Sequence, residues 1–194
     1  MPPGEPPKPE PPPSQVGQDV IQAMLVVARQ APPGPFLEVG VYQGGTAWHL
    51  GELALEQGRE LWLYDTFDGI PYAGPHDSHK VGDFRDTTYA QVALAIPHAH
   101  IIAGIFPASA QGPDSSHRWF PRERLAFVHL DCDQERAYRE AIAFLRPRMA
   151  RGGYMWFDDA PCLPGATQAV LEAFSPAELS LTRGKYYVKI GGPP

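Results

Sequence analysis

Apolar residues follow two patterns along this chain, and the patterns alternate from residue 15 to residue 174. Short continuous apolar runs predict buried strands, whereas apolar positions about 3.6 residues apart predict helices with one buried face. We expect Gly152-Gly153 to turn the chain before the strand at residues 154–157. We expect strands at residues 36–41, 61–64, 100–104, 125–130 and 154–157, and helices at residues 15–30, 47–57, 87–96, 134–146 and 167–174.

This alternation predicts the fold class. Strands that alternate with helices form right-handed crossovers and a mainly parallel sheet with helices on both faces. Residues 179–182 and 186–190 are two further apolar runs, and the short connection between them predicts an antiparallel pair. We therefore expect an α/β protein with a doubly wound, mainly parallel, Rossmann-like sheet and a terminal antiparallel strand.

The N-terminal segment has a different composition from the rest of the chain. Residues 1–17 contain eight prolines, and Val16 is their only large aliphatic residue. Such a segment cannot bury a core, so we expect a disordered or polyproline II tail over residues 1–17. The remaining residues, 18–194, suit a single domain.

Charge and composition restrict the partners. The chain has 16 Lys and Arg residues against 22 Asp and Glu residues, a net charge of −6, which argues against a dedicated nucleic-acid-binding protein. No apolar run is long enough to cross a bilayer, and the start of the chain lacks the pattern of a secretion signal. We expect a cytoplasmic protein without nucleic-acid or membrane partners, in which Cys132 and Cys162 are reduced thiols.

Candidate functional residues follow the first two predicted strands, because ligands of parallel α/β sheets bind at the carboxyl ends of the strands. The first strand leads into a glycine-rich turn with the spacing G-x-x-x-G-G from Gly40 to Gly45. Such a turn allows close approach of a ligand to a helix N-terminus, although a tight turn without a ligand explains it equally well. Asp65 follows the second strand, where an acid can accept both hydroxyls of a ribose or cap a loop.

Acidic residues follow two neighbouring strands further along the chain. Asp131 and Asp133 end the fourth strand, and Asp158 and Asp159 end the fifth. Carboxylates gathered at one sheet edge repel one another at neutral pH, and a bound Mg²⁺, Mn²⁺ or Ca²⁺ relieves this repulsion. The alternative is that some of these acids cap the following helices, Asp133 most of all.

Histidines are present at several positions near these acids. His129 shares a strand face with Asp131, so it is either a buried structural residue or a proton acceptor. His76 and His79 lie in a long loop over residues 66–85, and we expect them at the surface.

Five motifs occur in a fixed order: E-V-G-V-Y-Q-G-G-T from residue 38, Y-D-T-F-D-G-I-P from 64, G-D-F from 82, H-L-D-C-D from 129, and G-G-Y from 152 with paired acids at 158 and 159. In combination they resemble the macrocin-type O-methyltransferases, which methylate sugar hydroxyls of macrolide and aminocoumarin antibiotics. The resemblance covers about residues 35–160 and implies the class I methyltransferase fold.

The resemblance also implies a methyl donor, S-adenosylmethionine, and a metal cofactor, Mg²⁺. In such enzymes the metal binds two neighbouring oxygens of the acceptor and lowers the pKa of the hydroxyl that is methylated. The site residues that it implies are Glu38, Gly40 and Gly44 at the methionine end of the donor, Asp65 at its ribose, Gly45, Thr46 and Thr66 as further donor-binding residues, Asp131, Asp158 and Asp159 at the metal, and Asp131 or His129 as the proton acceptor.

The sequence departs from the family pattern after Asp133, where Gln134 to Tyr138 replace Leu-Tyr-x-Ser-Thr, and at Ala160, where an aromatic residue is common. The leading hypothesis is a metal-dependent O-methyltransferase that acts on a small-molecule hydroxyl acceptor, a sugar or a vicinal diol. Assembly into a homo-oligomer is left open. The alternatives are a non-catalytic S-adenosylmethionine-fold binding module and a nicotinamide-dependent oxidoreductase, which leaves the acids at strands four and five unexplained.

Overall fold

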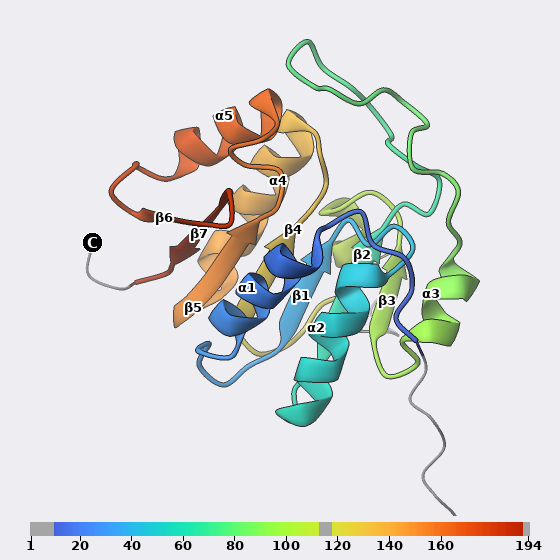
Figure 1. Cartoon of the computed structure of the whole chain (residues 1–194). Helices are drawn as coiled ribbons and strands as arrows, with labels where there is room; N and C mark the ends of the chain where they lie inside the picture. The colour runs from blue at the N-terminus through green and yellow to red at the C-terminus, as the bar shows by residue number, and fades with distance from the viewer. Residues whose placement is uncertain (1–9, 113–117, 192–194) are drawn as a thin grey trace, which may run out of the picture.

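A computed structural model describes residues 10–112 and 118–191 of the chain. One seven-stranded sheet forms its centre, in the order β3-β2-β1-β4-β5-β7-β6 (Figure 1). The first five strands pair in parallel, and the last two pair antiparallel to their neighbours. The predicted fold class is therefore confirmed. The strands are β1 (Phe36–Val39), β2 (Leu61–Asp65), β3 (His100–Ala103), β4 (Leu125–Leu130), β5 (Met149–Phe157), β6 (Leu179–Thr182) and β7 (Lys185–Lys189).

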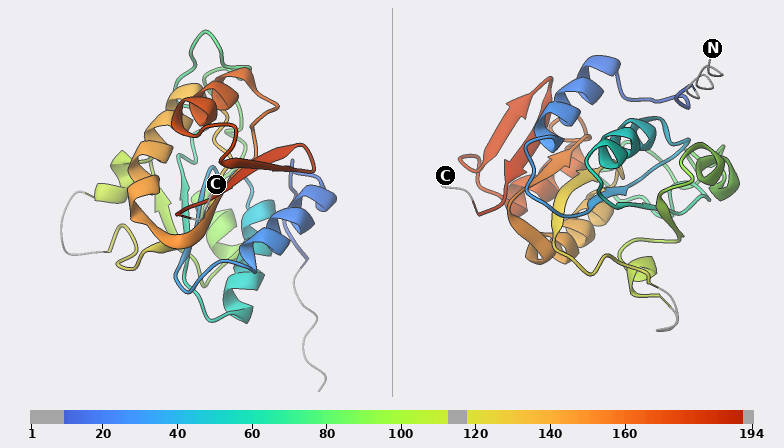
Figure 2. Two further views of the ribbon diagram at one scale, coloured as in Figure 1. Left: turned by 90° about the vertical axis from the view of Figure 1, so that its left-hand side faces the viewer. Right: turned by 90° about the horizontal axis from the view of Figure 1, so that it is seen from below.

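Helices cover both faces of this sheet. Figure 2 shows α1 and α2 on one side of the strands and α4 and α5 on the other. None of the helices among the described residues is both long enough and apolar enough to cross a bilayer. The helices are α1 (Gln18–Ala28), α2 (Gly45–Glu56), α3 (Tyr89–Ala95), α4 (Glu135–Leu145) and α5 (Pro164–Ala173), with short 3₁₀ turns η1 (Ala108–Gln111) and η2 (Arg146–Arg148).

The strands bury both of their faces. Trp62 and Tyr64 pack in the core beneath α4 and α5, whereas Leu61 and Leu63, which alternate with them, pack beneath α1 and α2. Successive side chains of a strand point to opposite faces, so a strand between two helical layers must be apolar at almost every position. This requirement produces the continuous apolar runs of the sequence.

The fifth strand begins earlier than the sequence predicts. β5 starts at Met149, and Gly152 and Gly153 lie inside it rather than in a turn before it. Gly152 has a φ of +83°, and the pairing of β5 with β4 is irregular at this point. A Cβ atom at Gly153 would lie 2.9 Å from the carbonyl oxygen of Ala126. The two glycines therefore allow an irregular strand to pass close to its neighbour.

The end of the proline-rich segment contacts the domain. Residues 10–17 form no helix or strand, but the Ser14 hydroxyl lies 3.1 Å from the Thr46 hydroxyl at the start of α2. A Cβ atom at Gly45 would lie 2.4 Å from the carbonyl oxygen of Pro13. The composition predicts a tail outside the fold, yet the last residues of this segment lie against α2. The part of the predicted tail before residue 10 lies outside the described residues.

Candidate functional site

A cavity of about 350 Å³ lies at the carboxyl ends of the parallel strands. This is the edge of the sheet at which ligands of doubly wound folds bind. Glu38, Gly44 and His129 are not among the described residues that line it. The predicted site residues that do line it are Gly40, Gly45, Thr46, Asp65, Thr66, Asp131, Asp158 and Asp159.

The glycine-rich turn forms one wall of the cavity. Gly44 precedes α2 with a φ of +90°, and no side chain in the described part of the chain caps the helix there. Gly45 and Thr46, the first residues of α2, line the cavity. The N–H groups at the start of a helix attract anions, so this wall can hold a carboxylate.

Asp65, at the end of β2, holds this turn in place. Its Oδ2 accepts hydrogen bonds from the backbone N–H groups of Val41 at 2.7 Å and Tyr42 at 2.8 Å. Its Oδ1 accepts a bond from the N–H of Phe67 at 2.7 Å. A carboxylate offers about four acceptor positions, so Asp65 retains capacity for a ligand hydroxyl while it shapes the turn. The sequence offered a ribose contact and a loop cap as alternatives for Asp65, and these three hydrogen bonds correspond to the loop cap.

A row of charged side chains runs beneath the cavity across four adjacent strands. Glu38 Oε1 lies 3.0 Å from His129 Nδ1, and His129 Nε2 lies 3.8 Å from Asp158 Oδ1. Asp158 Oδ2 in turn lies 2.8 Å from Lys185 Nζ. Burial alone would lower the pKa of His129, but the carboxylates of Asp158 and Glu38 outweigh it and raise that pKa well above its usual value. This row joins β1, β4, β5 and β7 through alternating charges.

His129 is fully buried within this row. It lies between two carboxylates and does not appear among the described residues that line the cavity. This arrangement corresponds to the first of the two alternatives for His129, a buried structural residue. A ligand in the cavity can instead reach the acids of the cavity wall.

Asp131 and Asp133 lie at the wall of the cavity after β4. Burial, and then the charges of Asp158 and Asp159, raise the pKa of Asp131 well above its usual value. Burial, and then the charge of Asp159, raises the pKa of Asp133 to about 8. Asp133 also has a φ of +61°, and its N–H donates to Asp159 Oδ2 at 2.9 Å. The backbone of Asp133 and the carboxylate of Asp159 are thus joined at this wall of the cavity.

The predicted metal ligands share the cavity but do not form a metal site. Asp158 is held by Lys185, and Asp159 accepts the N–H of Asp133. Among the residues that the structure describes, no group of three or more His, Cys, Asp or Glu side chains is arranged to hold a metal ion. The arrangement of these side chains therefore does not fit the predicted Mg²⁺.

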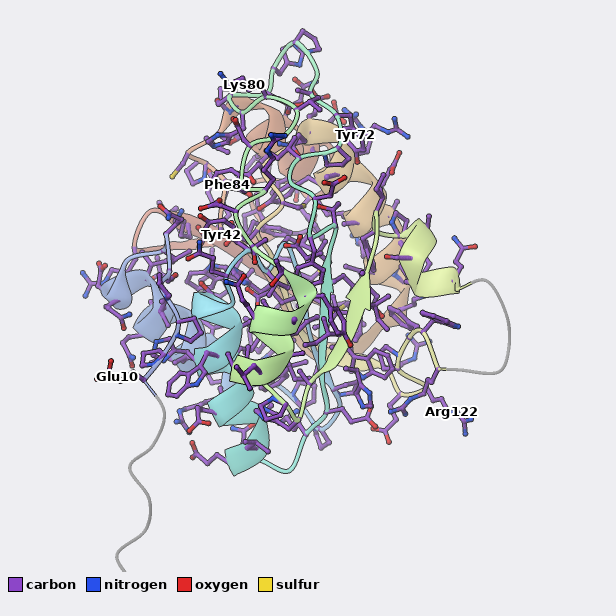
Figure 3. The ribbon with its side chains drawn as sticks, turned by 90° about the vertical axis from the view of Figure 1, so that its right-hand side faces the viewer. Glu10, Tyr42, Tyr72, Lys80, Phe84 and Arg122 are labelled. Carbon is purple, nitrogen blue, oxygen red and sulfur yellow. The ribbon has the colours of Figure 1, made fainter. Side chains whose placement is uncertain are left out.

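The loop over residues 66–85 covers the cavity with residues that the sequence analysis did not assign to the site. His79, expected at the surface, lines the cavity, and its Nε2 lies 3.5 Å from Asp133 Oδ1. The ring of Phe84 lies against the rings of His79 and Tyr42, at centroid distances of 4.9 Å and 5.5 Å. Figure 3 labels Phe84 and Tyr42. The unusual length of this loop is the sequence feature that points to such a role.

Gln134 is a second unassigned residue of the cavity. It precedes α4, is buried, and has an Nε2 group without a hydrogen-bond partner among the described residues. A buried amide without a partner is costly, and a ligand oxygen in the cavity can accept its hydrogen bond. The sequence marked this position only as a departure from the family pattern.

The sequence matches known methyltransferases. Residues 15–106 match the family model of macrocin-O-methyltransferase (TylF). The chain is 30% identical over 140 residues to the 8-demethyl-8-(2,3-dimethoxy-alpha-L-rhamnosyl)-tetracenomycin-C 4'-O-methyltransferase of Streptomyces olivaceus. This alignment covers 66% of this chain and 53% of that protein. It is 27% identical over 157 residues to the mycinamicin III 3''-O-methyltransferase of Micromonospora griseorubida, in an alignment that covers 74% of this chain and 61% of that protein. The chain thus aligns with little more than half the length of these relatives.

The fold matches solved methyltransferases. The O-methyltransferase NovP superposes with a TM-score of 0.74 at 19% identity, over 91% of this chain and 81% of that one. An O-methyltransferase from Bacillus cereus in complex with SAH superposes with a TM-score of 0.58 at 14% identity, over 90% of this chain and 82% of that one. These likenesses confirm the class I methyltransferase fold that the motifs implied.

Proposed function

Because this chain is similar to macrocin-type O-methyltransferases, we propose that it transfers the methyl group of S-adenosylmethionine to a hydroxyl of a small-molecule acceptor, a sugar or a vicinal diol. One observation carries the proposal: the acids after β4 and β5 share a cavity with the glycine-rich turn and the uncapped start of α2. A donor and a proton acceptor can thus meet at one edge of the sheet.

The donor fits the wall formed by β1, β2 and α2. We assign its methionine carboxylate to the N-terminus of α2 at Gly45 and Thr46, where helix N–H groups are free to bind an anion. Its ribose lies near Asp65, with Thr66 beside it. The O-methyltransferase from Bacillus cereus, which has a similar fold and was solved in complex with SAH, supports this choice of donor.

We assign proton removal to Asp133, with Asp131 as the second candidate. A general base works best when its pKa lies near the working pH, and the pKa of Asp133 is about 8. The carboxylate takes the proton of the acceptor hydroxyl while the oxygen attacks the methyl carbon in line with the carbon–sulfur bond. That bond breaks, its electron pair stays on sulfur, and the products are a methyl ether and S-adenosylhomocysteine.

The sequence also predicts that the reaction depends on Mg²⁺. The side chains of Asp131, Asp158 and Asp159 do not form a metal site, and the proposed reaction takes no step through one. Polar side chains of the cavity are assigned to the acceptor instead, including the Gln134 Nε2 group, which has no hydrogen-bond partner within residues 10–112 and 118–191. A cytoplasmic location and a homo-oligomeric state stay predictions.

The test is incubation of the full chain with S-adenosylmethionine and libraries of glycosides, sugar diols and catechols, followed by mass spectrometry. We expect products heavier by one methyl group. Asp133→Asn should lose this activity and Asp131→Asn should retain more of it, while Asp68→Asn, at an exposed position, should behave as the unchanged protein. Donor binding without methyl transfer to any acceptor would favour a binding module, and binding of NAD instead would favour an oxidoreductase.

A further inference from the structure

Lys185 supplies a positive charge to the acidic edge of the sheet. It is the first residue of β7, directly after the turn that joins β6 to β7. Its Nζ lies 2.8 Å from Asp158 Oδ2 and also donates a hydrogen bond to the carbonyl oxygen of Asp158. The side chains of Lys185 and Asp158 are only 16% and 8% exposed. The contact is therefore a largely buried ion pair, which solvent screens much less than a surface pair.

The register of the sheet explains how the two residues meet. β7 pairs antiparallel with β5, and Phe157 lies opposite Tyr186. Asp158 follows Phe157 and Lys185 precedes Tyr186, so the two residues lie directly beside this pair at the end of the paired segment. The pairing of β7 with β5 therefore brings Lys185 to the acidic edge.

Both oxygens of Asp158 face nitrogen atoms. Oδ1 faces His129 Nε2 at 3.8 Å, and Oδ2 faces Lys185 Nζ. A divalent ion bound through Asp158 Oδ2 would need that oxygen at about 2.0–2.4 Å, and the ammonium group bound to Oδ2 excludes a metal ion from it by size and by charge. Lys185 and a metal ion would compete for the same carboxylate.

We propose that Lys185 is the built-in counter-cation of this acidic edge: it takes the position at Asp158 that a divalent cation would otherwise hold, and so sets a low affinity of the cavity for metal ions. The acids Asp131, Asp133 and Asp159 then share a cavity in which one negative charge is already neutralised. This inference is independent of the methyl-transfer proposal, because it concerns cation binding by the protein alone.

Removal of the ammonium group should open the site to metal ions. Without Lys185, the carboxylate of Asp158 would keep His129 as its cationic neighbour but would lose the ammonium group from its Oδ2, next to Asp131 and Asp159. A cation from solution relieves such repulsion, and carboxylate oxygens are suitable ligands for Mg²⁺ and Mn²⁺. The divalent affinity of a Lys185→Met variant should therefore rise at least about tenfold, which corresponds to about 1.4 kcal/mol.

The experiment is a titration of the full chain with Mn²⁺, in which the free ion is measured by electron paramagnetic resonance. Lys185→Met should bind Mn²⁺ at least about tenfold more tightly than the unchanged protein. The matched control is Lys189→Met, on the same strand, because Lys189 is exposed and its Nζ lies over the ring of Tyr154 at 5.4 Å. The control should leave Mn²⁺ binding unchanged, and Asp158→Asn added to Lys185→Met should remove the gain.

One result would overturn the proposal: a Lys185→Met variant, shown to be folded by circular dichroism, that binds Mn²⁺ no more tightly than the unchanged protein. If Lys185→Met does not fold, Lys185→Gln removes the charge but keeps a hydrogen-bond donor for Asp158, and the same comparison then decides the question.

Discussion

Gly40 and Asp131 approach so closely that a Cβ atom at residue 40 would lie 1.7 Å from the carbonyl oxygen of Asp131. The contact joins the end of β1 to the end of β4, the two strands that lead into the glycine-rich turn and the acids of the cavity wall. Gly40 also has a φ of +86°, which residues with a side chain rarely adopt. The distance between these two parts of the cavity therefore depends on the absence of a side chain at residue 40.

We expect Gly40→Ala to destabilise the fold by roughly 2–5 kcal/mol, because overpacking costs about 1–3 kcal/mol and the left-handed backbone adds about 1–2 kcal/mol. Urea denaturation measures this loss. The matched control is Gly58→Ala, since Gly58 has a φ of +63° but open space around it. The control should cost only about 1–2 kcal/mol. Equal losses in the two variants would show that contact with Asp131 does not constrain the turn.

Asp65→Ala should weaken both the fold and donor binding. The N–H groups of Val41 and Tyr42 lose their acceptor, which costs about 1–3 kcal/mol of stability, and the distorted turn should bind S-adenosylmethionine at least about tenfold more weakly. Chemical denaturation and calorimetry measure the two effects. Asp68→Ala, at an exposed position of the same loop, should change stability by less than about 0.5 kcal/mol. A loss of affinity without any loss of stability would mean that Asp65 serves only the ligand.

His129→Ala should be among the most destabilising substitutions. It leaves the buried carboxylates of Glu38 and Asp158 without their shared partner, and removal of one member of a buried charge pair costs about 3–5 kcal/mol. Guanidinium denaturation is the measurement, with His98→Ala at an exposed position as the control. A stable His129→Ala variant that has lost only methyl transfer would instead establish His129 as a proton acceptor.

Ser14→Ala should weaken donor binding without unfolding the domain. Ser14 lines the cavity and reaches the hydroxyl of Thr46, and loss of one such hydrogen bond is worth about 0.5–1.5 kcal/mol. Deletion of residues 1–17 should reduce donor affinity further, but should change the melting temperature little because the described part of this segment buries no apolar core. Calorimetry measures donor affinity in each variant, with Glu10→Ala as the control. Full donor affinity after the deletion would show that this segment does not contribute to the donor site. Glu10 lies at the outer end of the described segment (Figure 3).

Asp133 should give the protein a characteristic pH dependence. Its pKa is about 8 in the folded protein and near 4 in an unfolded chain, so the folded state binds the extra proton between these values. Stability relative to Asp133→Asn should therefore fall as the pH rises from about 4 to about 8, and stay constant outside this window. Methyl transfer should show the opposite trend and rise through pH 8 as the base loses its proton. Denaturation curves and initial rates at several pH values test both trends, and a rate profile that is flat from pH 6 to 9 would exclude Asp133 as the base.

The sequence by itself determined the class of the sheet and the edge at which function lies. The apolar run at residues 125–130 coincides with β4, because a strand buried on both faces must be apolar at almost every position. Asp65, Asp131 and Asp158 follow strands that the alternation with helices makes parallel, so their arrival at one edge could be predicted. The motifs around them identified the methyltransferase resemblance that the comparisons confirm.

Only the tertiary structure decided how the charges at that edge are paired. Asp158 and Lys185 are 27 residues apart, and their contact depends on β7 lying beside β5 in one particular register. The raised pKa of Asp133 likewise depends on the depth of its burial and on the distance to Asp159. Local periodicity records which side of an element is buried, but it does not record which distant side chain lies opposite. Charge balance in a buried cluster is a sum over such distant neighbours, and for this reason the sequence predicted the acids but not Lys185, the cation that neutralises one of them.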